Sequence, residues 1–222
     1  MLTDPAESRI DRARIAGLLL AAGAGERYGQ PKALADTGSG PWVQRGIAAL
    51  EECDPILVVL GASSDQVAAA LPTGARSVLN PDFAEGMGSS LRVGLTALGA
   101  DSGRASILSE KDPALGDAAA RATFERPIDA ALVMLVDLPG VGPAVIQRVL
   151  AAAGPAAEAR SCLARAAFDG VLGHPVLLGA NHWPGVIDAA VGDRGARDYL
   201  RNRQVKLVEC GDIGSGEDVD VR

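Results

Sequence analysis

The sequence predicts an α/β protein, a single domain built on a doubly wound, mostly parallel sheet. Apolar runs of strand length recur at residues 15–22, 55–61, 77–79, 130–136 and 205–208, and the first of them is continuous, without alternating polar residues. Such runs are typical of strands covered on both faces in a parallel sheet. Helical patterns lie between them, and alternating strands and helices form βαβ units with right-handed crossovers. A glycine-rich loop directly follows the first run, and these sheets bind ligands beyond the carboxyl ends of their strands.

Helices are expected between the apolar runs. Apolar or small residues at helical spacing mark three helical faces: Trp42, Gly46, Ile47 and Leu50; Val67, Ala70 and Leu71; and Leu91, Leu95 and Leu98. Another helix is expected to begin near Pro143. The Ala-rich stretch 151–167 is interpreted as helix surface with a turn at Gly154 and Pro155.

Two segments stand apart from this pattern. Residues 101–127 are polar and carry too few apolar residues for another core strand, so we expect a surface insertion with one helix near residues 118–124. Residues 1–14 hold charges of both signs and lack the apolar centre of a secretory signal, so they are interpreted as a leader. The domain itself is expected to span residues 15–222.

Composition excludes several classes of protein. The chain has 222 residues, 48% of them hydrophobic, which suits one well-buried domain. A net charge of −7 disfavours a nucleic-acid binder, which normally presents a basic face. The three cysteines lack C-x-x-C spacing, so neither a zinc site nor a disulfide framework is expected. No apolar segment approaches the roughly 20 residues that span a bilayer, and the default expectation is a cytoplasmic protein.

The loop after the first apolar run has the composition of a polyphosphate site. Gly23, Gly25 and Gly29 can take positive φ and let backbone N–H groups approach an anion, while Arg27 and Lys32 add positive charge. Two better-known phosphate loops do not fit. The third glycine comes one residue too late for G-x-G-x-x-G, and the Gly-Lys-Ser/Thr of the Walker loop is absent.

The run 18–32 instead resembles the L-A-A-G-x-G-x-R-x-G-x-P-K signature of the nucleotidyltransferase superfamily that activates sugars, isoprenoid precursors and molybdopterin. The resemblance implies a Rossmann-like nucleotidyltransferase fold. It also implies that Arg27 and Lys32 act in catalysis by neutralising charge on a triphosphate. The implied nucleotide contacts in this run are Leu20, Ala21, Ala22, Gly23, Ala24, Gly25, Gly29 and Lys32.

Asp137 follows the apolar run 130–136 and precedes Leu138-Pro139-Gly140. A carboxylate at the carboxyl end of a central strand can hold Mg²⁺ over the ligand crevice. An aspartate here can also simply cap the turn or the next helix. A D-[ML]-P step is a second mark of the superfamily, in which this aspartate binds the divalent metal. The resemblance therefore implies Asp137 as a catalytic metal ligand and Mg²⁺ as the cofactor.

A second glycine-bearing loop, residues 80–91, runs into a helix whose expected cap is Ser89 or Ser90. Its N-x-x-x-x-x-G-M-G-x-S-L run resembles the MobA-like branch of the superfamily, the molybdenum cofactor cytidylyltransferases and guanylyltransferases. In that branch the loop helps to hold the nucleotide base. The implied contacts are Gly88, Ser89 and Ser90, together with Gly61 and Ala62 after the second apolar run.

Two later segments match the family's G-H-P-V and G-D-x-G-A-R motifs, at residues 173–176 and 192–197. The resemblance places His174, Asp193 and Arg197 on the acceptor side of the crevice. Taken alone, His174 is also consistent with a hydrogen-bonded structural residue. Asp193 and its neighbouring arginines are likewise consistent with a solvated helix start.

The chain departs from the family pattern near its end. The family usually carries D-I-D-T-P-E-D, whose second Asp is a further metal ligand, whereas residues 212–218 read D-I-G-S-G-E-D. Gly214 has no side chain with which to bind a metal. Either Asp212 or a water replaces this ligand, or the metal is held more weakly, or the protein has lost catalysis and kept binding.

Together the resemblances imply an enzyme in which a phosphate on molybdopterin attacks the α-phosphorus of a nucleoside triphosphate, with CTP favoured, and pyrophosphate leaves. A molybdoenzyme or accessory protein is a further expected partner. The alternatives are guanylyl transfer in the same branch, a sugar-phosphate or isoprenoid nucleotidyltransferase, and a non-catalytic nucleotide-binding accessory protein.

Overall fold

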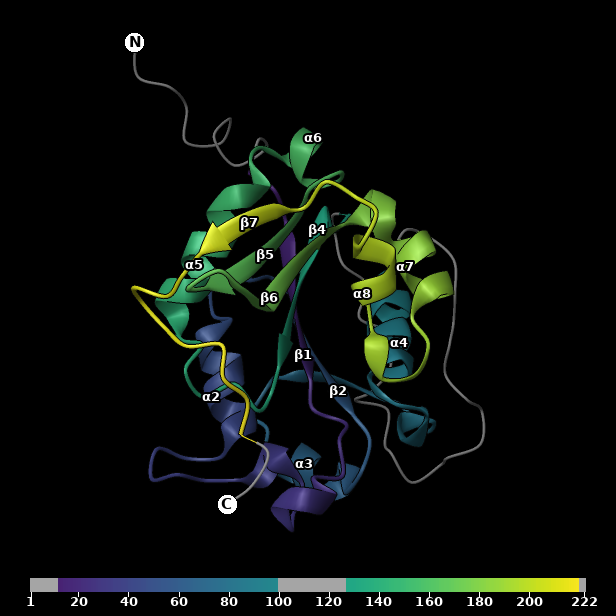
Figure 1. Ribbon diagram of the computed structural model, residues 1–222. Coiled ribbons are helices and arrows are strands. Elements are labelled where there is room, and N and C mark those ends of the chain that lie inside the picture. The colour runs from purple at the N-terminus through teal and green to yellow at the C-terminus, as the bar shows by residue number, and fades with distance from the viewer. Residues whose placement is uncertain (1–11, 100–126, 220–222) are drawn as a thin grey trace.

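The computed structural model describes residues 12–99 and 127–219, and these form a seven-stranded sheet between two helical layers (Figure 1). The strands are β1 (Ile15–Leu20), β2 (Ile56–Leu60), β3 (Arg76–Leu79), β4 (Ala130–Leu135), β5 (Leu163–Phe168), β6 (Val171–Gly179) and β7 (Lys206–Glu209). The α-helices are α2 (Trp42–Ala49), α3 (Ser64–Ala69), α4 (Met87–Gly99), α5 (Pro143–Leu150), α6 (Ala156–Ala159), α7 (Trp183–Ala189) and α8 (Arg197–Leu200). Short 3-10 turns lie at Glu26–Tyr28, Lys32–Leu34, Phe83–Glu85, Ala151–Ala153, Ala180–His182 and Gly192–Arg194.

The strand order is β3-β2-β1-β4-β6-β5-β7. The pairs β1–β2, β2–β3, β1–β4 and β5–β7 are parallel, whereas β6 runs antiparallel to both β4 and β5. The predicted fold class, an α/β protein with a mostly parallel sheet, is therefore confirmed. Most of the predicted leader, nearly all of the predicted insertion and its helix near residues 118–124 fall outside the described residues.

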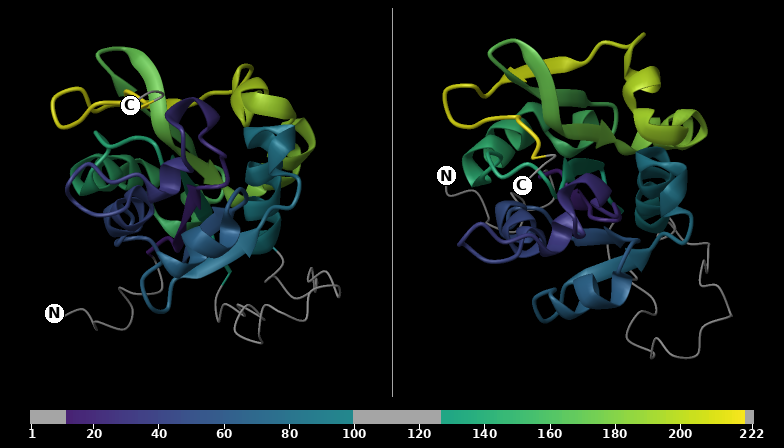
Figure 2. Two further views of the ribbon diagram at one scale, coloured as in Figure 1. Left: turned by 90° about the horizontal axis from the view of Figure 1, so that it is seen from below. Right: turned by 60° about the horizontal axis from the view of Figure 1, so that its bottom comes forward.

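The two faces of the sheet are covered by different helices. Leu19, Leu132 and Leu177 are fully buried in a core that extends over α2 and α5, and Leu18 and Leu178 are fully buried in a second core beneath α4 and α7. Both views in Figure 2 show α4 and the α2–α5 pair on opposite sides of the sheet. Because successive strand residues point to opposite faces, two-sided burial requires the continuous apolar runs seen in the sequence.

The interpretation of residues 151–167 as helix surface is partly wrong. Helical turns occur at Ala151–Ala153 and Ala156–Ala159, but Leu163–Phe168 is strand β5. Alanine has little preference for strands, and β5 forms because it pairs with β6 on one side and with β7 on the other. The expected cap of α4 is also corrected, because the helix begins at Met87, two residues before Ser89.

The chain after β7 returns to the end of β4. In Figure 1 this yellow segment runs from β7 past α5 towards α2. Backbone amides of Ser215 and Val219 donate to the carbonyls of Gly140 and Asp137, each over 3.2 Å. The C-terminal segment thus braces the loop that carries Asp137. Among the residues that the structure describes, none of the helices is long and apolar enough to cross a membrane.

Candidate nucleotide site

The carboxyl ends of β1, β2 and β4 meet at one edge of the sheet. The amide of Val136 donates to Leu20 O over 3.2 Å, and the amide of Ala62 donates to Ala22 O over 2.9 Å. A Cβ atom on Gly61 would lie only 2.6 Å from Ala22 O, so this close approach requires glycine. The loops expected to hold the triphosphate and the base are therefore neighbours.

The glycine loop is held in shape by its own backbone. Gly25 has a φ of 63°, and a Cβ atom there would lie 2.0 Å from Gln30 O. Its carbonyl accepts hydrogen bonds from the amides of Tyr28 and Gly29, each over 2.9 Å. Because those two amides already donate hydrogen bonds within the loop, the backbone amides of residues 23–27 are the ones left as candidates to bind phosphate.

Lys32 and Asp137 form an ion pair in which Lys32 Nζ lies 2.8 Å from Asp137 Oδ2. Their side chains are only 15% and 19% exposed. The structure thus brings together the cation at the end of the glycine loop and the carboxylate after β4. Arg27, in the 3-10 turn Glu26–Tyr28, is exposed to solvent in the same loop. The catalytic roles of all three residues stay predictions.

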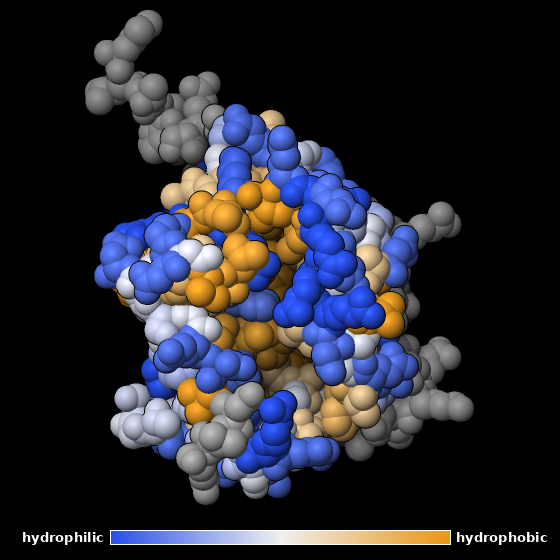
Figure 3. Space-filling model, viewed as in Figure 1, coloured by the Kyte–Doolittle hydropathy of each residue, from blue (hydrophilic) through white to orange (hydrophobic). Residues whose placement is uncertain are grey.

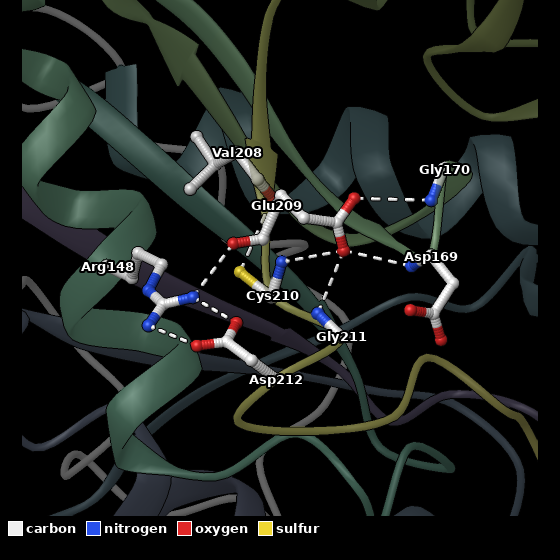
Figure 4. Close-up of polar contacts among 8 residues, drawn as sticks. All are labelled: Arg148, Asp169, Gly170, Val208, Glu209, Cys210, Gly211 and Asp212. Carbon is white, nitrogen blue, oxygen red and sulfur yellow. Dashed lines mark hydrogen bonds and ion pairs between the residues drawn. The ribbon is translucent and has the colours of Figure 1, made fainter.

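The prediction that Asp212 is a metal ligand is not supported by its surroundings. Arg148 of α5 binds both oxygens of Asp212, with Nη2 2.9 Å from Oδ2 (Figure 4). This pairing lowers the pKa of the Asp212 carboxyl and raises that of the Arg148 guanidinium. Nearby, Glu209 accepts hydrogen bonds from the amides of Asp169 and Gly170 (Figure 4). Asp212 therefore belongs to a structural polar cluster around the end of β7.

Within residues 12–99 and 127–219, no group of three or more His, Cys, Asp or Glu side chains is arranged to hold a metal. A Mg²⁺ site does not require one, since Mg²⁺ commonly uses one or two carboxylates together with substrate phosphates and water. Asp137 next to the glycine loop fits that pattern.

Ser89 and Ser90 are placed inside the protein. The side-chain amide of Asn80 donates to Ser89 Oγ over 2.8 Å and to Ser90 Oγ over 3.0 Å, and all three residues are buried. Ser89 Oγ donates in turn to Gly86 O. As placed, these hydroxyl groups hold the loop in shape, which argues against the prediction that they contact the base directly.

The base-side loop packs tightly on the acceptor-side loop. A Cβ atom on Gly88 would lie 2.9 Å from Ala190 O, and one on Gly86 would lie 2.5 Å from Asp193 Oδ1. Asp193 itself is exposed. The segments that the sequence assigned to the nucleotide base and to the acceptor are therefore in direct contact.

His174 of β6 lines a small cavity together with Leu20, Met87, Val133, Gly195 and Ala196. Burial lowers the pKa of its imidazole to about 4, with smaller contributions from the positive charges of Arg165 and Arg197. His174 is therefore neutral at physiological pH.

Sequence reasoning missed Arg165, which lies on β5. Its guanidinium donates to Gly173 O from Nη2 over 3.1 Å and from Nε over 3.3 Å. The only signal was a charged residue inside the Ala-rich stretch, and that stretch was interpreted as helix surface.

Figure 3 shows a hollow in the middle of the face that is seen in Figure 1. Hydrophobic residues lie along its left rim and hydrophilic residues along its right rim, over α8. The family model of the MobA-like NTP transferase domain matches residues 17–207. The chain belongs to this family. A curated relative from Paenarthrobacter nicotinovorans, named Nicotine blue oxidoreductase, is 33% identical over 214 residues, which cover 93% of this chain and 92% of the relative.

Solved structures share the fold of this MobA-like chain. A Mycobacterium sp. strain JC1 homologue of Mycobacterium tuberculosis Rv0371c superposes with a TM-score of 0.67 at 23% identity, covering 95% of this chain and 92% of the other. Rv0371c of M. tuberculosis H37Rv, solved in complex with manganese, has a TM-score of 0.60 at 22% identity, covering 89% of this chain and 88% of the other.

Proposed function

We propose that this MobA-like nucleotidyltransferase transfers a cytidylyl group from CTP to the phosphate of molybdopterin and releases pyrophosphate. The observation that carries the proposal is the Lys32–Asp137 pair, 2.8 Å across, at the junction of the glycine loop and the end of β4. It sets one cation and one carboxylate beside backbone amides that can receive a polyphosphate. The run at residues 80–91 resembles the branch that transfers cytidylyl or guanylyl groups, and within that branch we propose CTP.

The ion pair supplies both charges that the reaction needs. Without nucleotide, Lys32 and Asp137 neutralise one another. When a triphosphate enters, the ammonium of Lys32 can turn to its oxygens, which frees the carboxylate of Asp137 to ligate a divalent cation. Bound there, Mg²⁺ would neutralise phosphate charge and help to align the two substrates. Mg²⁺ is proposed from the oxygen donor, and a related fold has been solved with manganese.

The chain's own residues contribute orientation and charge, and they form no covalent bond with the substrate. The amides of residues 23–27 would hold the triphosphate, and Lys32 and Arg27 would stabilise the charge that develops as pyrophosphate leaves. A phosphate monoester is already ionised at neutral pH, so the attack on the α-phosphorus requires no general base.

Pyrophosphate release tests the proposal. The purified chain is incubated anaerobically with Mg²⁺, purified molybdopterin and CTP, GTP, ATP or UTP in separate reactions. We expect pyrophosphate with CTP only when the acceptor is present, together with a product heavier by one cytidylyl group in the mass spectrum. Release with GTP alone would assign guanylyl transfer. Absence of pyrophosphate with every nucleotide would contradict nucleotidyl transfer to molybdopterin.

A redox function is the second candidate, because the relative at 33% identity is named an oxidoreductase. Such a reaction does not need the carboxylate that Gly214 lacks. The glycine loop could instead receive the pyrophosphate of a nicotinamide dinucleotide, although its glycine spacing departs from the dinucleotide pattern. Consumption of NADH or NADPH in the presence of nicotine blue, with no pyrophosphate from any nucleotide, would establish this alternative.

A further inference from the structure

In the part of the chain that the structure describes, Arg165 and Arg197, near the His174 cavity, lack the carboxylate partner that two neighbouring arginines possess. Arg194 and Arg201 both pair with Asp198, over 2.9 Å and 3.1 Å. Among the described residues, no carboxylate pairs with Arg165 or with Arg197. In a chain of net charge −7, this is a local concentration of uncompensated positive charge.

Hydrogen bonds hold the guanidinium of Arg165 next to the backbone of a cavity residue, His174. Arg165 Nε and Nη2 are anchored on the carbonyl of Gly173, the residue directly before His174. The β5–β6 ladder is irregular between Arg165 and Ala167. A guanidinium carries five N–H donors in a planar fork, and one carbonyl occupies only two of its nitrogens. The remaining nitrogen, Nη1, can donate to a ligand without disturbing the anchor.

Arg197 follows two other residues that line the same cavity. It begins α8 directly after Gly195 and Ala196, which line the cavity with His174. Burial and, to a smaller extent, the positive charge of Arg197 lower the pKa of the Arg165 guanidinium, so the two arginines interact electrostatically. Burial and, to a smaller extent, both arginines also keep the His174 imidazole neutral. The guanidinium of Arg165 is partly buried and that of Arg197 is exposed. An anion that enters between these two like charges stabilises both.

The cavity also locates this charge relative to the nucleotide. Leu20, the last residue of β1, lines it, and the glycine loop begins at the next residues of the chain. Met87 and Gly195 bring the base-side and acceptor-side loops to the same place. An anion bound here would therefore lie beside the triphosphate loop.

We propose that Arg165 and Arg197, with neutral His174 beside them, form a subsite for a phosphate group of the second substrate, and that Arg165 determines specificity for a doubly charged acceptor. The identity of the anion as an acceptor phosphate rests on the proposed function. The existence of the anion subsite does not.

Inorganic phosphate is the probe. Its affinity for the full chain is measured by calorimetry in phosphate-free buffer for the wild type and for Arg165→Met, Arg165→Lys, Arg197→Met and Arg194→Met. Arg194 is the matched control, because it is a neighbouring arginine whose charge is already paired with Asp198. Loss of one charge-assisted contact corresponds to roughly tenfold or more in affinity. We expect that loss in Arg165→Met and Arg197→Met, a smaller loss in Arg165→Lys, and none in Arg194→Met.

Unchanged phosphate affinity in a folded Arg165→Met protein would overturn the subsite. An equal loss of phosphate affinity in Arg194→Met would overturn it too, because phosphate would then bind through the general positive charge of the surface. The acceptor assignment is tested separately by kinetics. Arg165→Met should raise the KM for molybdopterin at least tenfold and leave the KM for CTP within about twofold. Phosphate binding at Arg165 without pyrophosphate release from any nucleotide would retain the subsite and reject the proposed function.

Discussion

Lys32 Nζ lies 2.8 Å from Asp137 Oδ2, although the two residues are 105 positions apart in the sequence. The contact exists because β1 and β4 are adjacent and parallel, with Leu20 paired to Leu135 at their carboxyl ends. Each strand therefore delivers its loop to the same edge of the sheet. The account of catalysis depends on this pair.

Lys32→Ala should reduce turnover by roughly two to three orders of magnitude, as expected for loss of one preorganised charge-stabilising donor. It should also lower the free energy of unfolding by roughly 1–3 kcal/mol, since the half-buried Asp137 loses its partner. The steady-state rate and a urea titration measure the two effects. Lys206→Ala is the control, because Lys206 is exposed and its Nζ contacts only Ala152 O among the described residues. Turnover of folded Lys32→Ala close to that of Lys206→Ala would remove Lys32 from the mechanism.

Gly214→Asp, which would restore the family's carboxylate, is expected to destabilise the protein. A Cβ atom at Gly214 would lie 2.8 Å from Gly140 O and 2.7 Å from a methyl group of Val145. Overpacking of this kind costs roughly 1–3 kcal/mol, visible as a lower urea midpoint. Gly23→Ala is the control, since nothing lies within 4 Å of a Cβ atom there. An unchanged midpoint together with activity at lower Mg²⁺ concentration would show instead that a metal carboxylate fits at this position.

The His174 imidazole should make stability depend on pH. Its pKa is about 4 in the folded protein against an ordinary value of 6.5. Between these values the unfolded chain binds more protons, so the free energy of unfolding should rise with pH from about 4 to about 6.5. His174→Gln should flatten that rise in urea titrations across the window. An equal slope in wild type and His174→Gln would show that His174 does not titrate abnormally.

Much of the fold was predictable because burial on both faces leaves a direct trace in the sequence. The runs that became β1, β2 and β4 are continuously apolar, and their loops follow the parallel-sheet rule to the same edge. Strand β5 left no such trace. Its Leu-Ala-Arg-Ala-Ala-Phe sequence has helical propensity, and only pairing with β6 and β7 makes it a strand.

The same distinction applies to the site. Lys32 and Asp137 are singled out by motifs at strand ends, and the structure brings their side chains together, while their catalytic roles stay predictions. Arg165 could not be singled out, because its contact with Gly173 O depends on the register of a hairpin that the sequence did not reveal. Asp212 was assigned by its motif, and the motif contains no information about Arg148, which approaches it from α5.

Calorimetric titration of CTP with and without Mg²⁺ tests the central claim, that Asp137 and the glycine loop form a site for a metal-bound triphosphate. Wild type, Asp137→Asn and Asp212→Asn are compared. The account predicts that Mg²⁺ tightens CTP binding at least tenfold in wild type and in Asp212→Asn, and by less than about twofold in Asp137→Asn. An equal Mg²⁺ effect in wild type and Asp137→Asn would contradict the assignment of Asp137 and return it to the role of a turn cap.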